Sequence, residues 1–250
     1  MISLEQKISN WISKYLENNK LQSLVIGISG GIDSAVTSTL CAMTGSKTYV
    51  VIMPIHQKSD ETNRGIEHCN WLISKFPNVE MIKVDLTESF EQFKTNFSKE
   101  YDNKLALANT RARLRMTTLY LIAGNKNGIV AGTGNKVEDF GVGFYTKYGD
   151  GGVDISPIAD LMKSEVFELG KKIGVIDSIL NAKPTDGLWD DERTDEDQLG
   201  VSYDELEWAM TFKGDISSLS EQQKYILDTY KKHRNKNIHK MIDIPVYKNE

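Results

Sequence analysis

The sequence predicts an α/β fold, a doubly wound parallel sheet flanked by helices, with a helical C-terminal appendage. Between residues 23 and 133, short apolar runs rich in β-branched residues alternate with segments of helical periodicity. This alternation is typical of parallel strands joined by crossover helices. A glycine-rich turn joins the first such run to the following helix, as at the ligand-binding edge of open α/β sheets. After residue 163 the helical patterns continue without another strand.

The predicted elements follow one another with short connections. An amphipathic helix opens the chain, and Ser3 and Gln6 at its start have the spacing of a capping box. The expected strands cover residues 23–28, 48–53, 79–84 and 129–133. The expected helices between them cover residues 34–45, 60–76, 87–100 and 105–128.

The second half of the chain is less regular. Residues 134–154 are rich in glycine and predict a long irregular loop of a functional type. The acidic segment 183–200 is expected to be mobile. Further helices are expected over residues 163–174, 203–212 and 219–234. Because the sequence has no internal repeat or low-complexity tract, we predict one domain over residues 1–250.

Composition disfavours several classes of protein. The net charge of −5 argues against a broad nucleic-acid-binding surface. No apolar run approaches the roughly 20 residues of a membrane span, and the N-terminus lacks the pattern of a signal peptide. Cys41 and Cys69 lie in helical segments without metal-ligand or disulfide spacing. We therefore expect a soluble, cytoplasmic protein with reduced thiols and no nucleic-acid or membrane partner.

The stretch GISGGIDSAV, residues 27–36, gathers glycine and hydroxyl residues where the first strand meets its helix. Backbone N–H groups in such a turn can bind phosphate, and the helix N-terminus adds partial positive charge. The stretch matches neither the Walker pattern nor GxGxxG. Asp33 suggests a carboxylate ligand for a phosphate-bound Mg²⁺. The alternative is an ordinary strand-to-helix turn in which Asp33 or Ser34 caps the helix.

Several motifs resemble those of a known family. SGGIDS, residues 29–34, is similar to the SGGxDS loop of the ATP pyrophosphatases, the adenine nucleotide alpha hydrolases, which split ATP between its α- and β-phosphates. Later segments resemble successive motifs of ammonia-dependent NAD synthetase. They are NTRARLRM (109–116), GTGNKVE (132–138), GFYTKYGDGGVDISPIADLMKSEVFELG (143–170), KPTDGLW (183–189), TDEDQLGVSYDELE (194–207) and HK (239–240). The resemblance runs along almost the whole chain.

The resemblance implies a ligase that forms a C–N bond in the last step of NAD biosynthesis. Such an enzyme activates the nicotinate carboxylate of deamido-NAD with ATP and releases pyrophosphate. Ammonia then displaces AMP from the adenylate to give NAD. The resemblance also implies Mg²⁺ as the metal and a homodimer as the assembly. Because no segment is left over for a glutamine-hydrolysing domain, free ammonia is the expected nitrogen donor.

The same resemblance implies the site residues. Asp33 and Glu138 would bind Mg²⁺, and the implied catalytic residues are Asp33, Lys163 and Thr185. ATP would contact the loop residues Gly27, Ile28, Ser29, Gly30, Gly31, Ile32, Asp33 and Ser34, together with Thr133, Lys163 and Thr185. Deamido-NAD would contact Arg113, Lys147, Asp154, His239 and Lys240.

Some of these residues have a plain structural alternative. Lys163 could be a surface lysine, and Glu138 a loop glutamate in solvent. Asp150 and Asp154 could be turn residues. The two C-terminal residues of this set, 239 and 240, lie in an apparent tail that we expect to become ordered when substrate binds.

Two further regions leave alternatives open. Arg111, Arg113 and Arg115 alternate along one helical segment, so we expect one or two of them to be solvated. In DFGVGFY, residues 139–145, the stretch is one residue longer than the usual family form. Phe144 or Tyr145 could therefore contact substrate or belong to the core.

Two other kinds of function are compatible with the glycine loop. tRNA-thiolating and GMP-forming enzymes also carry SGGxDS and adenylate a different acceptor. The thiolating enzymes, however, need reactive cysteines and a basic surface. A non-catalytic nucleotide-binding module is expected to lack Asp33, Glu138 or Lys163, and all three are present.

Overall fold

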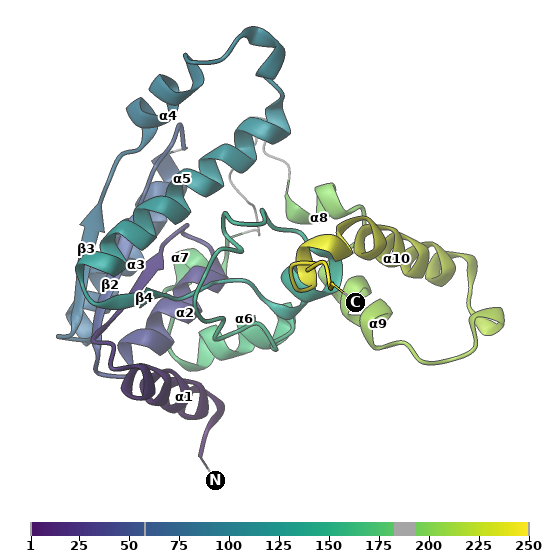
Figure 1. Cartoon of the computed structure of the whole chain (residues 1–250). Coiled ribbons are helices and arrows are strands. Elements are labelled where there is room, and N and C mark those ends of the chain that lie inside the picture. Colours follow the sequence, from purple (N-terminus) through teal and green to yellow (C-terminus); the bar gives the residue numbers. More distant parts are fainter. Residues whose placement is uncertain (1, 58, 183–193, 250) are drawn as a thin grey trace.

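A four-stranded parallel sheet lies at the centre of the computed structural model, which describes residues 2–57, 59–182 and 194–249 (Figure 1). The strands are β1 (Ser23–Gly27), β2 (Lys47–Ile52), β3 (Val79–Lys83) and β4 (Gly128–Val130). Their order is β3-β2-β1-β4. Strands β2 and β3 are therefore added on one side of β1, and β4 is added on its other side, so the strand order reverses between β1 and β4. The predicted fold class is confirmed. Ligands of open α/β sheets bind at such a reversal, outside the carboxyl ends of the strands.

Helices cover both faces of the sheet (Figure 1). One face packs against α1 (Leu4–Asn19), α2 (Ile32–Ala42), α3 (Ser59–Lys75), α6 (Lys163–Lys172) and α7 (Asp177–Leu180). The other packs against α4 (Thr87–Lys94) and α5 (Lys104–Asn125). Val25 and Ile26 of β1 are fully buried and point into these two cores. A strand buried on both faces is expected to have a continuous apolar run, as Leu24, Val25 and Ile26 form in the first predicted strand.

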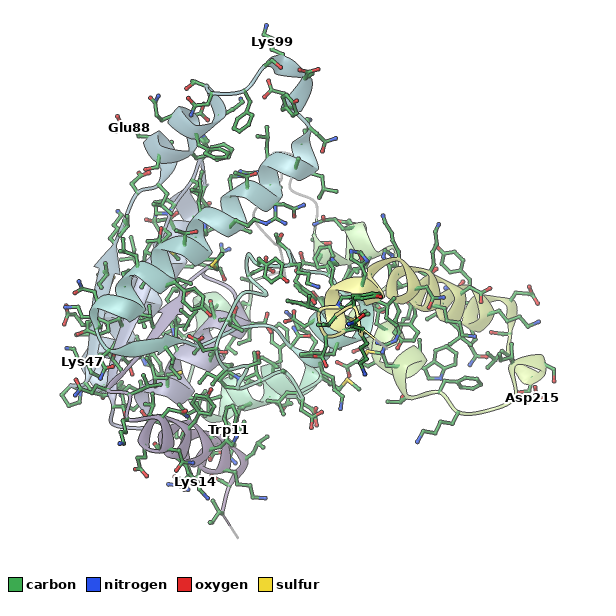
Figure 2. The ribbon with its side chains drawn as sticks, viewed as in Figure 1. Trp11, Lys14, Lys47, Glu88, Lys99 and Asp215 are labelled. Atoms are coloured by element: carbon green, nitrogen blue, oxygen red, sulfur yellow. The ribbon has the colours of Figure 1, made fainter. Side chains whose placement is uncertain are left out.

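The last helices lie to one side of the sheet (Figure 1). A third apolar cluster joins them. It is formed by the π-helical turn η2 (Lys136–Val142) and by α8 (Asp195–Leu199), α9 (Tyr203–Thr211) and α10 (Glu221–Met241). Short 3-10 turns, η1 (Lys99–Tyr101) and η3 (Ile216–Ser218), complete the described elements. Figure 2 shows Lys99 at the outer end of the α4–α5 connection and Asp215 at the outer end of the α9–α10 connection. None of the described helices combines the length and apolar character that crossing a membrane requires.

Two predicted boundaries and one predicted capping interaction are wrong. The helix expected over 87–100 ends at Lys94, because the side chains of Thr95 and Asn96 bond back to backbone carbonyls and compete with a further turn. Ser3 has the backbone conformation of an N-cap, but its side chain makes no capping hydrogen bond. The strand expected to reach residue 133 ends at Val130.

Two further corrections bear on the site. Residues 136–142 of the expected loop form η2, because the Asn135 side chain accepts hydrogen bonds from the N–H groups of Val137 and Glu138. Helix α10 extends to Met241, so His239 and Lys240 lie in its last turn rather than in a tail. Within the acidic segment, residues 183–193 lie outside the described part, and the residues from 195 to 199 form α8.

A buried histidine joins the two helices next to the glycine loop. His68 of α3 is fully buried, with Nε2 2.9 Å from the Ser38 hydroxyl of α2. Its ring stacks on Trp71 with centroids 5.5 Å apart. Burial lowers the pKa of His68 from 6.5 to about 4. The folded state therefore requires the neutral imidazole.

This burial predicts a pH dependence of stability. The unfolded chain protonates His68 as the pH falls below 6.5, whereas the folded chain resists protonation down to about pH 4. Its contribution is fully present above pH 6.5 and is lost as the pH falls through that window, by up to about 3 kcal/mol. We expect the unfolding free energy of the wild type to fall more steeply between pH 7 and 4.5 than that of His68→Gln, measured by denaturant titration. The carboxylates titrate in both proteins, so they do not affect the comparison. An equal pH dependence of the unfolding free energy in the two proteins would show that the prediction is wrong.

Candidate active site

The glycine loop stands at the carboxyl end of β1, as predicted. Strand β1 ends at Gly27, and Gly31 is the N-cap of α2. Gly30 has φ +86°, and a Cβ there would stand 2.5 Å from the Glu61 carbonyl oxygen, so glycine is required. The Ser34 hydroxyl donates to the Gly31 carbonyl at 3.0 Å. The turn is therefore fixed, with its N–H groups at the positive end of α2.

Three charged side chains from three elements meet beside the loop. The Lys163 ammonium, at the start of α6, donates to Asp33 Oδ2 of α2 at 2.6 Å and to Glu138 Oε1 of η2 at 2.9 Å. The Lys163 side chain is 4% exposed, against 18% and 16% for the carboxylates. Lys163 is therefore not a surface lysine, and Glu138 is not a solvated loop residue.

Asn135 holds the two carboxylates in place. Its Nδ2 donates to Asp33 Oδ1 at 3.0 Å, and its Oδ1 accepts from the N–H of Glu138 at 3.0 Å. The side chain is fully buried. Asn135 follows β4 and Asp33 follows β1, and these strands are hydrogen-bonded neighbours. The sheet order thus brings together residues that are 102 positions apart in the chain.

Electrostatics fix the charges of the cluster. Burial opposes the charge on Lys163, but Asp33 and Glu138 outweigh it and raise the pKa of the ammonium. Burial also opposes the charge on Glu138, but Lys163 and the Tyr203 hydroxyl outweigh it and lower its pKa. For Asp33 burial prevails over the attraction of Lys163, and the pKa is raised. Lys163 is consequently a hydrogen-bond donor and a fixed positive charge, not a base.

Tyr203 belongs to this cluster although sequence reasoning gave it no role. Its hydroxyl donates to Glu138 Oε1 at 2.6 Å, and its ring lies 4.9 Å from the Lys163 ammonium. On the same helix, Glu207 accepts from the Ser164 N–H at 2.9 Å. Helix α9 thus holds both Glu138 and the start of α6. The only sequence signal was the position of Tyr203 inside the quoted motif 194–207.

A cavity of about 740 Å³ extends from the glycine loop to the last turn of α10. Near β1 and β4 its lining is apolar and includes Met53, Leu119 and Ala131. Asp33, Glu138 and Lys163 also line it. Its volume lies in the range of small-molecule binding sites.

The far end of the cavity is cationic. Arg113 donates to the carbonyl of Lys147 at 3.2 Å, and Lys147 donates to the carbonyl of His239 at 3.0 Å. Lys240 donates to the carbonyl of Tyr145 at 2.8 Å and also to that of Gly143. Carbonyls orient these cations, and the carboxyls of Asp139 and Asp150, which also line the cavity, lie close enough to interact with Lys240. Such an arrangement suits an anionic ligand.

Comparison with known proteins identifies the family. A family model for NAD synthase matches residues 4–250. The chain belongs to the NAD synthase family. Its resemblance to that family, noted in the motifs, is therefore confirmed.

Individual relatives agree with this assignment. The chain is 40% identical over 205 residues to the NH(3)-dependent NAD(+) synthetase of Finegoldia magna, covering 81% of each protein. It is 35% identical over 240 residues to that of Carboxydothermus hydrogenoformans, covering 94% of this chain and 93% of the relative.

Two solved structures resemble the whole chain. The NMN synthetase from Francisella tularensis has a TM-score of 0.88 at 34% identity, covering 99% of this chain and 98% of that one. The NH3-dependent NAD synthetase from Campylobacter jejuni has a TM-score of 0.79 at 25% identity, covering 98% of each.

Most residues expected of an NAD synthase site line this one cavity. They are the loop residues from Gly27 to Ser34, Arg113, Thr133, Glu138, Lys147, Lys163, His239 and Lys240. Asp154 is not part of the lining. Its carboxylate accepts hydrogen bonds from the Val130 N–H at 2.8 Å and from the Tyr120 hydroxyl at 3.0 Å. Thr185 lies outside the described residues.

Two arginines of the motif in α5 have different surroundings. Arg113 is exposed at the cavity. Arg115 donates through Nε to the Met53 carbonyl at 3.0 Å, and burial lowers its pKa to about 10. Arg115 is thus a link between α5 and the end of β2, not a solvated charge.

For residues 144 and 145 the structure shows both expected roles, core and cavity lining. Phe144 packs against the C-terminal cluster, whereas the Tyr145 hydroxyl donates to the carbonyl of Lys240 at 2.5 Å. Both side chains also line the cavity. The Asp150 carboxylate accepts from the Thr146 N–H at 3.0 Å, which makes it a turn residue as well as a lining residue.

The contact of Tyr203 with Glu138 leads to a testable prediction for this NAD synthase. Tyr203→Phe keeps the buried ring but removes the hydroxyl that donates to a charged group. Losing such a hydrogen bond typically lowers the equilibrium or rate that depends on it by about tenfold. We expect turnover to fall roughly tenfold, measured as the rate of amide formation at saturating substrates. Tyr230→Phe, in the same apolar cluster, is the control and should match the wild type. Equal losses in the two variants would mean that Tyr203 only contributes packing.

Proposed function

We propose that this chain catalyses the ATP-dependent amidation of deamido-NAD by ammonia, giving NAD, AMP and pyrophosphate. The observation that carries the proposal is the shared cavity. It joins a phosphate-binding loop, the Asp33–Lys163–Glu138 cluster and a cationic end in a chain of the NAD synthase family. The named activity of the relatives supports the same reaction.

The first step is activation of a carboxylate. An oxygen of the nicotinate carboxylate attacks the α-phosphorus of ATP, the bond from phosphorus to the bridging oxygen of pyrophosphate breaks, and an acyl adenylate forms. Negative charge grows on the leaving pyrophosphate. The N–H groups of Ser29 and Gly31 already donate to hydroxyls of the loop. The remaining loop N–H groups up to Ser34 and the Lys163 ammonium are fixed donors that can stabilise that charge.

Asp33 and Glu138 fit a magnesium ion. Both carboxylates line the cavity and both accept a hydrogen bond from the same cation, the Lys163 ammonium. Mg²⁺ usually takes one or two carboxylates and completes its shell with phosphate oxygens and water. Among the described residues there is no group of three or more His, Cys, Asp or Glu that could hold a metal by itself. When bound, the ion would supply positive charge to the phosphate oxygens.

The second step is transfer to ammonia. Neutral ammonia attacks the carbonyl carbon of the adenylate, the bond to the AMP oxygen breaks, and a proton is lost to give the amide. Arg113, Lys147, His239 and Lys240 would hold the phosphates of deamido-NAD at the cationic end. Thr133 would contact ATP beside the loop. The proposed contacts of Thr185 with ATP and of Asp154 with deamido-NAD stay predictions from the resemblance.

A second candidate reaction is favoured by one comparison. The structure with a TM-score of 0.88 is called an NMN synthetase. The analogous acceptor would be nicotinate mononucleotide, which carries the same carboxylate and lacks the adenylate half. The chemistry at the α-phosphorus and at the carbonyl is identical for both acceptors.

One set of incubations tests the proposal. Pure protein is incubated with Mg·ATP, ammonium and either deamido-NAD or nicotinate mononucleotide, and AMP, pyrophosphate and the amide are quantified. We expect equal yields of all three with deamido-NAD. Turnover of the mononucleotide alone would establish the second candidate, and AMP and pyrophosphate without amide would indicate another acceptor. Absence of ATP cleavage would leave a nucleotide-binding module.

Two further properties follow from the family. Replacing ammonium by glutamine in the same incubation should abolish product, because free ammonia is the proposed nitrogen donor. We also propose that residues 1–250 act as one catalytic domain within a homodimer. A monomeric sedimentation mass for the active protein would overturn the dimer.

A further inference from the structure

An arginine outside every quoted motif stands beside the glycine loop. Arg64 lies on α3, which packs closely against the loop. A Cβ added to Gly30 would stand 3.5 Å from the Arg64 Cβ and 3.2 Å from the Gly65 nitrogen. Arg64 lines the same cavity as Ser29, Gly30 and Gly31.

One nitrogen of the half-buried Arg64 guanidinium has no hydrogen-bond partner among the described residues. Its Nε is buried and makes no hydrogen bond. Nearby carboxylates on α3 are directed elsewhere: Glu61 accepts from Gln57 at 2.9 Å, and Glu67 accepts from Ser178 at 2.7 Å. A buried donor on a charged group without an acceptor is unfavourable, so such a group calls for an explanation.

An anionic ligand in the cavity supplies that explanation. The planar guanidinium matches the geometry of phosphate, with which it can form two parallel charge-assisted hydrogen bonds. The neighbouring loop has the features of a phosphate site, with glycine backbone and a helix N-terminus. Arg64 stands on the α3 side of that loop, whereas Lys163 approaches the cluster from α6.

We propose that Arg64 is a further binding residue for the β- and γ-phosphates of ATP and for the pyrophosphate that leaves. This inference rests on the proposed function, because it assumes that ATP occupies the loop. The contact adds a positive charge from α3 to the one that Lys163 supplies from α6. It predicts that Arg64 contributes to the affinity for ATP and pyrophosphate and not to the affinity for AMP, which lacks both phosphates.

The experiment compares three ligands on the whole chain. Calorimetric titration with Mg²⁺ present measures the affinity of wild type, Arg64→Gln and Arg64→Lys for pyrophosphate, ATP and AMP. We expect Arg64→Gln to lower the affinity for pyrophosphate and for ATP by about tenfold or more and to leave the affinity for AMP unchanged. Arg64→Lys keeps the charge and should recover part of the loss. Lys75→Ala, at the exposed far end of α3, is the control and should bind all three ligands like the wild type.

The outcomes separate this inference from the proposed function. Unchanged pyrophosphate affinity in Arg64→Gln, with normal amidation by the wild type, would overturn the role of Arg64 and leave the function intact. Equal weakening of all three ligands would also overturn it, since it would indicate a general disturbance of the site. If the wild type binds pyrophosphate through Arg64 but amidates neither acceptor, the proposed function fails while the binding role stands. Thermal unfolding of each variant confirms that the compared proteins are folded.

Discussion

Replacement of Asp33 by asparagine is expected to lower turnover by about a thousandfold while the protein remains folded. Asparagine keeps the shape of the side chain but removes a proposed Mg²⁺ ligand and the partner of Lys163 at 2.6 Å. Loss of a fixed group that stabilises developing charge typically lowers turnover by 10²- to 10³-fold. The measurement is kcat at saturating Mg²⁺, together with denaturant unfolding.

The matched control is another carboxylate outside the cavity. Asp160 is 96% exposed and pairs with Lys136, so Asp160→Asn should turn over like the wild type. Near-normal kcat for Asp33→Asn at saturating Mg²⁺ would show that the metal assignment is wrong. A large loss of unfolding free energy in Asp33→Asn would mean instead that the residue mainly supports the fold.

Replacement of Lys163 by methionine is expected to abolish measurable turnover and to lower the unfolding free energy by about 3 kcal/mol or more without divalent metal. Lys163 is only 3% exposed and lies between two carboxylates. Methionine fills a similar volume, but it leaves Asp33 and Glu138 facing each other without a cation. Removing one partner of a buried ion pair is strongly destabilising for this reason.

A metal titration distinguishes this mechanism from a simple packing defect. We expect Mg²⁺ to raise the unfolding free energy of Lys163→Met more than that of the wild type, because the ion can take the place of the ammonium between the carboxylates. Lys171→Met removes an exposed ion pair of the same helix and should change stability by less than about 1 kcal/mol. If Mg²⁺ does not raise the unfolding free energy of Lys163→Met, the loss of stability comes from poorer packing and not from the two unpaired carboxylates.

Local sequence patterns predicted the elements that bring the site together. The apolar run at 23–28, the helix after it and the helix over 105–128 all have counterparts, because helical and strand periodicities act over a few residues. The departures arose where side chains interact with nearby backbone. Thr95 and Asn96 stop a helix whose periodicity continues, and Asn135 starts a helical turn in a glycine-rich stretch.

The sequence by itself determined the fold class, the position of the glycine loop and the identity of Asp33, Glu138 and Lys163 as candidates, since each depends on a short pattern or motif. Only the tertiary structure decided how these residues meet. Lys163 reaches Asp33 across 130 positions, and Tyr203 reaches Glu138 across 65. Such contacts depend on strand order and helix packing, which bring distant segments together and leave no local periodicity to read. Arg64 was missed for the same reason, because one arginine among polar residues becomes informative only when its neighbours in space are known.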